Sequence, residues 1–192
     1  MKPLSFLMLF VLLDAASGPC VSLDNQSYCL AWSNSTSALD TYEYVRSGET
    51  VDDWKNLITL QRYNTSASFD EMMRAQDAQL RKSVKPHWFK PANPVHTNET
   101  ATEVKLTDGS DTEYTLFYFF QDTGRRIESA IFSRHKPLAS GEPPSRAQLD
   151  RWISQMRAMS PPPAHVASYT PQTRRTGTIP RAEAFPVVKG PR

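Results

Sequence analysis

The clearest pattern in the chain is an aromatic stretch, TEYTLFYFFQ, at residues 112–121. Successive side chains of a strand point to opposite faces, so this stretch divides into two sets of residues. One set is Tyr114, Leu116, Tyr118 and Phe120, and the other is Thr115, Phe117, Phe119 and Gln121. Both sets are apolar in the middle, which is typical of a central strand covered on both sides. The pattern therefore favours a structural role over a binding surface.

Two segments have the spacing of amphipathic helices, in which apolar side chains recur every three or four positions. In residues 68–83, Ser68 and Glu71 have the spacing of a capping box. The apolar residues of this segment and its flank are Phe69, Met72, Met73, Leu80 and Val84. Residues 145–159 begin with the same spacing, at Ser145 and Gln148, and their apolar residues are Leu149, Trp152, Ile153 and Met156. We expect both helices to pack on the sheet.

Shorter alternating segments predict further strands near the N-terminus. β-Branched and aromatic residues bounded by Asn, Ser and Asp predict a hairpin of residues 27–33 and 40–46. Thr50 and Asp53 again have capping-box spacing, which predicts a short helix. The alternation at residues 58–63 indicates that this helix gives way to a strand.

A three-stranded meander is predicted downstream. Residues 102–107, 112–121 and 125–135 alternate in the manner of strands, and the turns between them contain Asp108-Gly109 and Thr123-Gly124. Tight turns that contain glycine and are flanked by alternating segments are a strong hairpin signal.

These segments predict one α+β domain at residues 19–160. We expect an antiparallel sheet of about five to six strands with helices packed on it. The strand at residues 125–135 carries Ser129 and Ser133 on one face, which we interpret as a position nearer an edge or a cleft.

The first 18 residues have the features of a secretory signal peptide. Lys2 precedes an apolar run from Leu4 to Leu13, and small residues follow at 15–18. The apolar run is too short to cross a bilayer. We therefore predict export to the periplasm or the extracellular space, with no transmembrane segment after signal cleavage.

Two cysteines, Cys20 and Cys29, would remain in the exported chain. An exporting compartment is oxidising enough for them to pair, although two unpaired thiols are the alternative. Closing so short a loop would stabilise the fold by roughly 2.5 kcal/mol in the chain-entropy model.

Residues 161–192 are rich in proline and have no sustained hydrophobic period, which predicts a disordered tail. This segment has five basic residues and one acidic residue, a net charge of +4, whereas the whole chain has a net charge of +2. Such a spread of charge gives only weak, salt-sensitive attraction to anionic surfaces. We therefore expect no specific nucleic-acid partner.

The sequence KPHWFKP offers a candidate binding site. Trp88 and Phe89 lie between Lys85 and Lys90 in a segment whose prolines restrict it to a loop or an edge strand. Aromatic side chains beside lysines in such a position predict an exposed amphipathic patch that contacts a partner protein.

The histidines provide the rival hypothesis, a small secreted hydrolase that uses His135 or His96. This hypothesis requires His87, His96 or His135 to lie beside a carboxylate or hydroxyl in a concave pocket. No histidine pair or Cys/His cluster has metal-ligand spacing, so we predict no metal site. The chain also lacks a nucleophile elbow, a phosphate loop and a dinucleotide fingerprint, so we expect no cofactor.

A third hypothesis is a eukaryotic secreted glycoprotein. Four asparagines, Asn25, Asn34, Asn64 and Asn98, begin an Asn-x-Ser/Thr triplet. This hypothesis requires all four to lie on exposed loops.

The segment YEYVRSGETVDDWKNLITLQRY, residues 42–63, resembles small exported bacterial proteins of uncharacterised function. The order of elements is also similar to Mog1/PsbP-like domains, which have an antiparallel sheet flanked by helices. Neither resemblance implies an activity or a catalytic residue. The leading functional hypothesis is a non-catalytic binding or accessory protein of the bacterial envelope.

Overall fold

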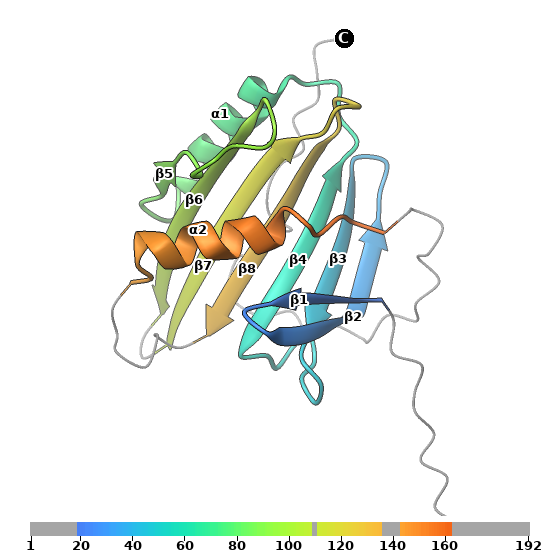
Figure 1. The fold of residues 1–192 in the computed structure, drawn as a ribbon, viewed down its shortest axis with the longest axis vertical. Helices are drawn as coiled ribbons and strands as arrows, with labels where there is room; N and C mark the ends of the chain where they lie inside the picture. Colours follow the sequence, from blue (N-terminus) through green and yellow to red (C-terminus); the bar gives the residue numbers. More distant parts are fainter. Residues whose placement is uncertain (1–18, 109–110, 136–142, 163–192) are drawn as a thin grey trace, which may run out of the picture.

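The computed structural model describes residues 19–108, 111–135 and 143–162 of the 192-residue chain. In this part of the chain, eight strands form one antiparallel sheet in the order β1-β2-β3-β4-β8-β7-β6-β5 (Figure 1). The strands are β1 (Cys20–Leu23), β2 (Gln26–Ser35), β3 (Leu39–Val45), β4 (Asn56–Tyr63), β5 (His87–Phe89), β6 (Glu99–Asp108), β7 (Asp111–Gln121) and β8 (Ile127–His135). The helices are α1 (Phe69–Leu80) and α2 (Arg146–Met156). The α+β class is confirmed, but the sheet has eight strands where five to six were expected.

The two additional strands, β1 and β5, lie at the two edges of the sheet. β1 turns into β2 through Asp24 and Asn25, both of which have positive φ (53° and 61°). A two-residue turn with this backbone suits the twist of a hairpin, and Asp and Asn tolerate it better than most residues. β5 has only three residues and lies in the segment that the prolines restrict to a loop or an edge strand.

The sheet consists of two four-stranded meanders that meet where β4 pairs with β8. β8 is therefore central, and our expectation of an edge or cleft position for it was wrong. Ser129 and Ser133 are buried between neighbouring strands. The Ser129 hydroxyl donates to Gln61 Oε1 at 3.2 Å, and Ser133 Oγ lies 2.9 Å from Thr115 Oγ1. These polar side chains satisfy one another within the sheet.

The short helix expected after Thr50 is absent from the structure. Asp53 N–H does donate to Thr50 Oγ1, at 3.1 Å, but the backbones of these two residues also bond to each other in both directions. These reciprocal bonds close a tight loop, and residues 50–53 form a turn and not a helix. Trp54 is buried beside Val51, and β4 begins two residues later.

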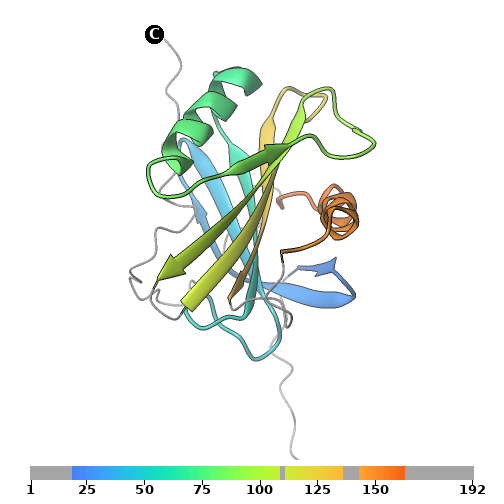
Figure 2. The ribbon, with the colours of Figure 1, turned by 90° about the vertical axis from the view of Figure 1, so that its left-hand side faces the viewer.

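The two helices pack on opposite faces of the sheet (Figure 2). Leu116, Tyr118 and Phe120 of β7 share one apolar cluster with α2. Phe117 and Phe119 share another with α1. The aromatic stretch is therefore the centre of the core, as its pattern predicted.

The predicted helix starts are confirmed at both helices. Ser68 caps α1 in a complete capping box with Glu71, and the two reciprocal bonds are present. At α2 the Ser145 hydroxyl accepts from Gln148 N–H at 3.3 Å, which is half of that arrangement.

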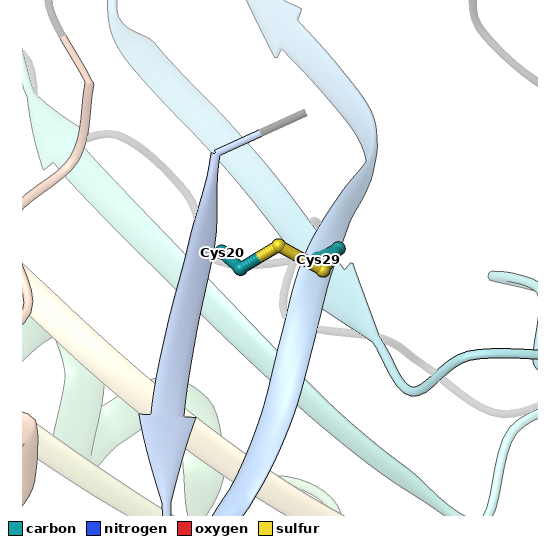
Figure 3. Close-up of a disulfide and its surroundings, with 2 residues drawn as sticks. All are labelled: Cys20 and Cys29. Carbon is teal, nitrogen blue, oxygen red and sulfur yellow. A yellow bond between two sulfur atoms is a disulfide. The ribbon is translucent and has the colours of Figure 1, made fainter. Parts of the chain in front are cut away.

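Cys20 and Cys29 form a disulfide across the β1–β2 hairpin (Figure 3). Leu23 of this hairpin is buried in the cluster that includes α2, and Asp24 N–H donates to Gln155 Oε1 at 2.9 Å. The hairpin is thus fixed to the domain by packing as well as by the covalent bond.

The described chain continues two residues into the segment predicted to be a tail. The carbonyls of Pro161 and Pro162 accept hydrogen bonds from Arg62 at 2.9 and 3.2 Å. The predicted signal peptide, residues 1–18, and residues 163–192 lie outside the described residues. Within the described part, neither helix is long and apolar enough to cross a membrane.

Candidate functional site

A groove with a volume of about 410 Å³ lies between α1 and the edge strand β5. Its lining combines apolar side chains with charges of both signs. The lining residues are Phe69, Asp70, Met73, Arg74, Asp77, Arg81, Trp88, Lys90 and Thr100. Two of the four predicted contact residues, Trp88 and Lys90, are among them.

The alternation of β5 separates the two aromatic residues of KPHWFKP. Trp88 points to the α1 side and packs near Phe119, with 6.2 Å between the ring centroids. Phe89 packs against the cluster on the α2 side, where the Arg146 guanidinium lies 4.6 Å from its ring centroid. The predicted Trp88–Phe89 patch is therefore not one surface, because neighbouring residues of a strand face opposite ways.

The indole of Trp88 is held in place by Asp77 on α1. Its Nε1–H donates to Asp77 Oδ1 at 2.6 Å. Arg81 Nε, one helical turn further on, donates to both oxygens of the same carboxylate at 2.9 and 2.8 Å. The Arg81 hydrogen bond, followed by the Trp88 hydrogen bond, holds the pKa of Asp77 below its usual range. Asp77 therefore fixes the ring at the groove and neutralises Arg81.

The other charges of the groove belong to Asp70, Arg74 and Lys90. All three side chains are exposed, and Lys90 Nζ has a long contact of 3.4 Å with the Glu99 carbonyl. With Asp77 and Arg81 paired, one acidic and two basic side chains remain, so the groove has a net positive charge. Lys85 is exposed but does not line the groove.

The backbone edge of β5 is a poor template for an added strand. It is only three residues long, Pro86 precedes it, and Pro91 follows shortly after. Short edge strands with nearby prolines are a common protection against strand addition. A ligand of this groove would therefore be held mainly by side chains.

The sequence suggested Trp88 and Lys90 but missed the contribution of α1. Asp70, Arg74, Asp77 and Arg81 follow one another at helical spacings of four, three and four, so they share one side of the helix. That spacing was visible in the sequence. The position of β5 beside this side of α1 was not.

The histidines do not converge. His87 Nδ1 lies 2.8 Å from Glu103 Oε1, but the side chain is 70% exposed. His135 Nε2 lies 3.7 Å from Glu113 Oε2, on the opposite face of the sheet, and His96 stacks on Phe120. None of these three histidines lines the groove. The groove therefore does not bring a histidine beside a carboxylate, and His165 lies outside the described residues.

No group of three or more His, Cys, Asp or Glu side chains that could hold a metal ion occurs among the described residues.

The glycoprotein hypothesis required four asparagines on exposed loops. Asn25, Asn34 and Asn64 are exposed, although Asn34 lies within β2. Asn98 is half-buried, and its amide donates to Gln121 Oε1 at 2.8 Å. The requirement is therefore not met.

Residues 17–107 match a family model of uncharacterised bacterial proteins. The match covers slightly less than half of the 192-residue chain and includes every residue that lines the groove. No curated protein and no solved structure match the chain. The resemblance to Mog1/PsbP-like domains therefore has no support from solved structures.

Proposed function

We propose that this chain is an exported, non-catalytic accessory protein of the bacterial envelope, and that it binds a partner protein through the groove between α1 and β5. The observation that carries the proposal is the fixed position of Trp88. Its indole nitrogen is bonded to Asp77 while the side chain is only half-buried, at the rim of a groove. Aromatic side chains with an apolar body and a bonded polar end are common centres of binding energy.

The chemistry of the groove defines the partner. Phe69, Met73 and Trp88 offer an apolar surface, while Arg74 and Lys90 offer positive charge beside it. A segment with an apolar side chain next to carboxylates would satisfy both. We therefore expect an acidic, partly apolar segment of an envelope protein.

The groove is better suited to binding than to catalysis. No histidine lines it, and the pKa of Asp77 is lowered by its partners, which makes this carboxylate a weak base. The disulfide is consistent with an oxidising compartment, and the bacterial family match is consistent with an envelope location.

The proposal can be tested with an array of overlapping peptides that tile the exported proteins of the source bacterium. The double variant Arg74→Glu/Lys90→Glu reverses both unpaired cations of the groove. We expect the wild-type chain to select acidic peptides that contain an apolar residue. We expect the double variant to bind them about tenfold more weakly or worse, which corresponds to at least about 1.4 kcal/mol.

Two matched controls locate the effect. Lys55→Glu reverses an exposed charge outside the groove and should leave binding unchanged. Lys85 lies near β5 but does not line the groove. A loss of binding in Lys85→Glu would therefore indicate that the partner contacts a surface outside the groove. Equal binding by wild type and the double variant would refute the proposal.

A further inference from the structure

The chain beyond β5 is held by two side chains of α2, on the face of the sheet opposite the groove. We call Arg146 and Asp150 the α2 pair, in which Arg146 Nε donates to Asp150 Oδ2 at 3.0 Å. Arg146 Nη2 also donates to the Lys90 carbonyl at 2.6 Å. Asp150 Oδ1 accepts from the backbone N–H of Ala92 at 3.3 Å. The α2 pair therefore binds the backbone on both sides of Pro91.

These contacts match the groups that the backbone offers at this point. Proline has no N–H, so the Lys90 carbonyl precedes the buried Pro91 and the Ala92 N–H follows it. The α2 pair supplies one donor and one acceptor for them. Arg157, the C-cap residue of α2, donates to the Ala92 carbonyl at 3.2 Å and adds a third contact to the same segment. The chain after β5 is thus attached to α2.

The end of β5 depends on this attachment. β5 pairs with β6 through three residues, and the last of these pairs is Phe89 with Ala101. The Thr100 hydroxyl reaches the Phe89 carbonyl at 3.4 Å, which is a long contact. The bond from Arg146 to the Lys90 carbonyl is much shorter, and its donor is charged, which strengthens it. The same guanidinium lies over the Phe89 ring, 4.6 Å from its centroid, so Arg146 is the main constraint on the backbone here.

The alternation of β5 transmits this constraint to the groove. Trp88 and Lys90 line the groove on the α1 side, whereas Phe89 between them packs on the α2 side. Figure 2 shows the chain after β5 passing to the α2 side of the sheet, away from α1. The backbone of Lys90 is thus bonded on one face while its side chain lies in the groove on the other. A shift of this backbone would move one of the two cations of the groove.

We propose that Arg146 is a positioning residue for the groove, and that it fixes the place of Lys90 there before a partner binds. This inference rests on the proposed function and extends it to a residue on the opposite face of the sheet. Arg146 does not line the groove, so it acts through β5 and not by touching the partner. A binding site whose cation is already in place loses less conformational freedom when the partner binds, which increases affinity.

Nitrogen-15 relaxation of the full chain without a partner tests the positioning directly. Arg146→Met removes the hydrogen-bond donors but keeps an apolar side chain near Phe89. We expect the order parameter of the Lys90 amide to fall from about 0.85, the value of a rigid backbone, toward about 0.6. The matched control is Arg151→Met, which removes the same charge from an exposed position of α2 that contacts Asp24 at 3.5 Å. This control should leave the Lys90 amide unchanged.

Binding of the acidic peptides selected by the array tests the consequence for the groove. Arg146→Met should bind them about threefold to tenfold more weakly, because Lys90 must then be ordered on binding. Arg146→Lys keeps the charge and a donor for the Lys90 carbonyl and should restore most of the affinity, and Arg151→Met should bind as the wild type does. The indole signals of the four tryptophans verify that each variant is folded.

Three outcomes would overturn the inference and leave the proposed function standing. They are an unchanged Lys90 order parameter in Arg146→Met, equal peptide binding by the wild type and Arg146→Met, and an equal loss of binding in Arg151→Met. A wild-type chain that binds no peptide would instead refute the proposed function, and this inference with it.

Discussion

At the scale of single residues, the interaction between Trp88 and Asp77 is the most informative contact of the candidate site. It joins the edge strand to α1 through one carboxylate that also binds Arg81. Ionisation of Asp77 should therefore be visible at the Trp88 indole.

We predict that the Trp88 indole signal titrates in acid, with a midpoint below about 3.9, the usual pKa of Asp. The hydrogen bonds from Arg81 and Trp88 lower the pKa of Asp77 in the folded state. Their stabilising effect is therefore present above the unfolded-state pKa and is lost as pH falls through the folded-state pKa. Proton NMR of the indole N–H measures this midpoint.

Trp88→Phe assigns the signal, and Asp77→Asn should abolish its titration. A midpoint above the usual Asp range, or an unchanged titration in Asp77→Asn, would show that Asp77 does not control this contact.

A second prediction concerns the buried carboxylate of Glu99, which is 2% exposed. Tyr118 OH and Arg157 Nη2 donate to it at 2.6 and 2.7 Å, and burial followed by the Glu99 contact raises the pKa of Tyr118. Arg157→Gln should destabilise the fold by about 3–5 kcal/mol, because it leaves a buried charge without its ionic partner. Chemical denaturation measures the change.

Arg81→Gln is the matched control for this prediction, since it breaks an exposed pair and should cost less than about 1 kcal/mol. Equal losses in the two variants would contradict the assignment of Arg157 as the partner of a buried charge.

At the scale of elements, the N-terminal caps determine where the helices begin. Ser68→Ala should destabilise the protein by about 1 kcal/mol, because it removes the hydroxyl that bonds Glu71 N–H at 3.3 Å. Ser145→Ala should have an effect of similar size or smaller, since α2 has only half of the capping box. Urea denaturation of both variants compares them. A clearly larger loss of unfolding free energy in Ser145→Ala than in Ser68→Ala would contradict the prediction.

At the scale of the whole molecule, the disulfide joins β1 to β2, so the stability of the fold should depend on whether its surroundings are oxidising or reducing. Cys20→Ser/Cys29→Ser should lower the free energy of unfolding by roughly 2.5 kcal/mol, because the unfolded chain gains freedom. Adding a reductant should have the same effect on the wild type and no further effect on the double variant. Stability that is unchanged by reduction would show that packing of Leu23 and Asp24 alone holds the hairpin.

Local patterns predicted most of the secondary structure because they are written in neighbouring residues. The alternation of residues 112–121 and the apolar spacing of α1 and α2 were sufficient to identify these elements. A local pattern gave a wrong prediction where contacts with distant residues decide the backbone conformation. Thr50 and Asp53 have capping-box spacing, but burial of Trp54 and the backbone bonds of the loop prevail over it.

The candidate site was predicted only in part for the same reason. The sequence identified Trp88 and Lys90, since aromatic and basic residues between prolines are recognisable in one short segment. It could not identify Asp77 or Arg74, because α1 reaches β5 through tertiary packing and not through sequence proximity.

The sequence by itself determined the α+β class, the two capped helices and the central aromatic strand, because each depends on periodicity and on local hydrogen bonds. Only the tertiary structure decided that the sheet has eight strands, that β8 is central, and that Trp88 and Phe89 face opposite ways beside different helices. These features depend on strand order and on which face each helix covers. Both are set by the burial of side chains that are far apart in the chain.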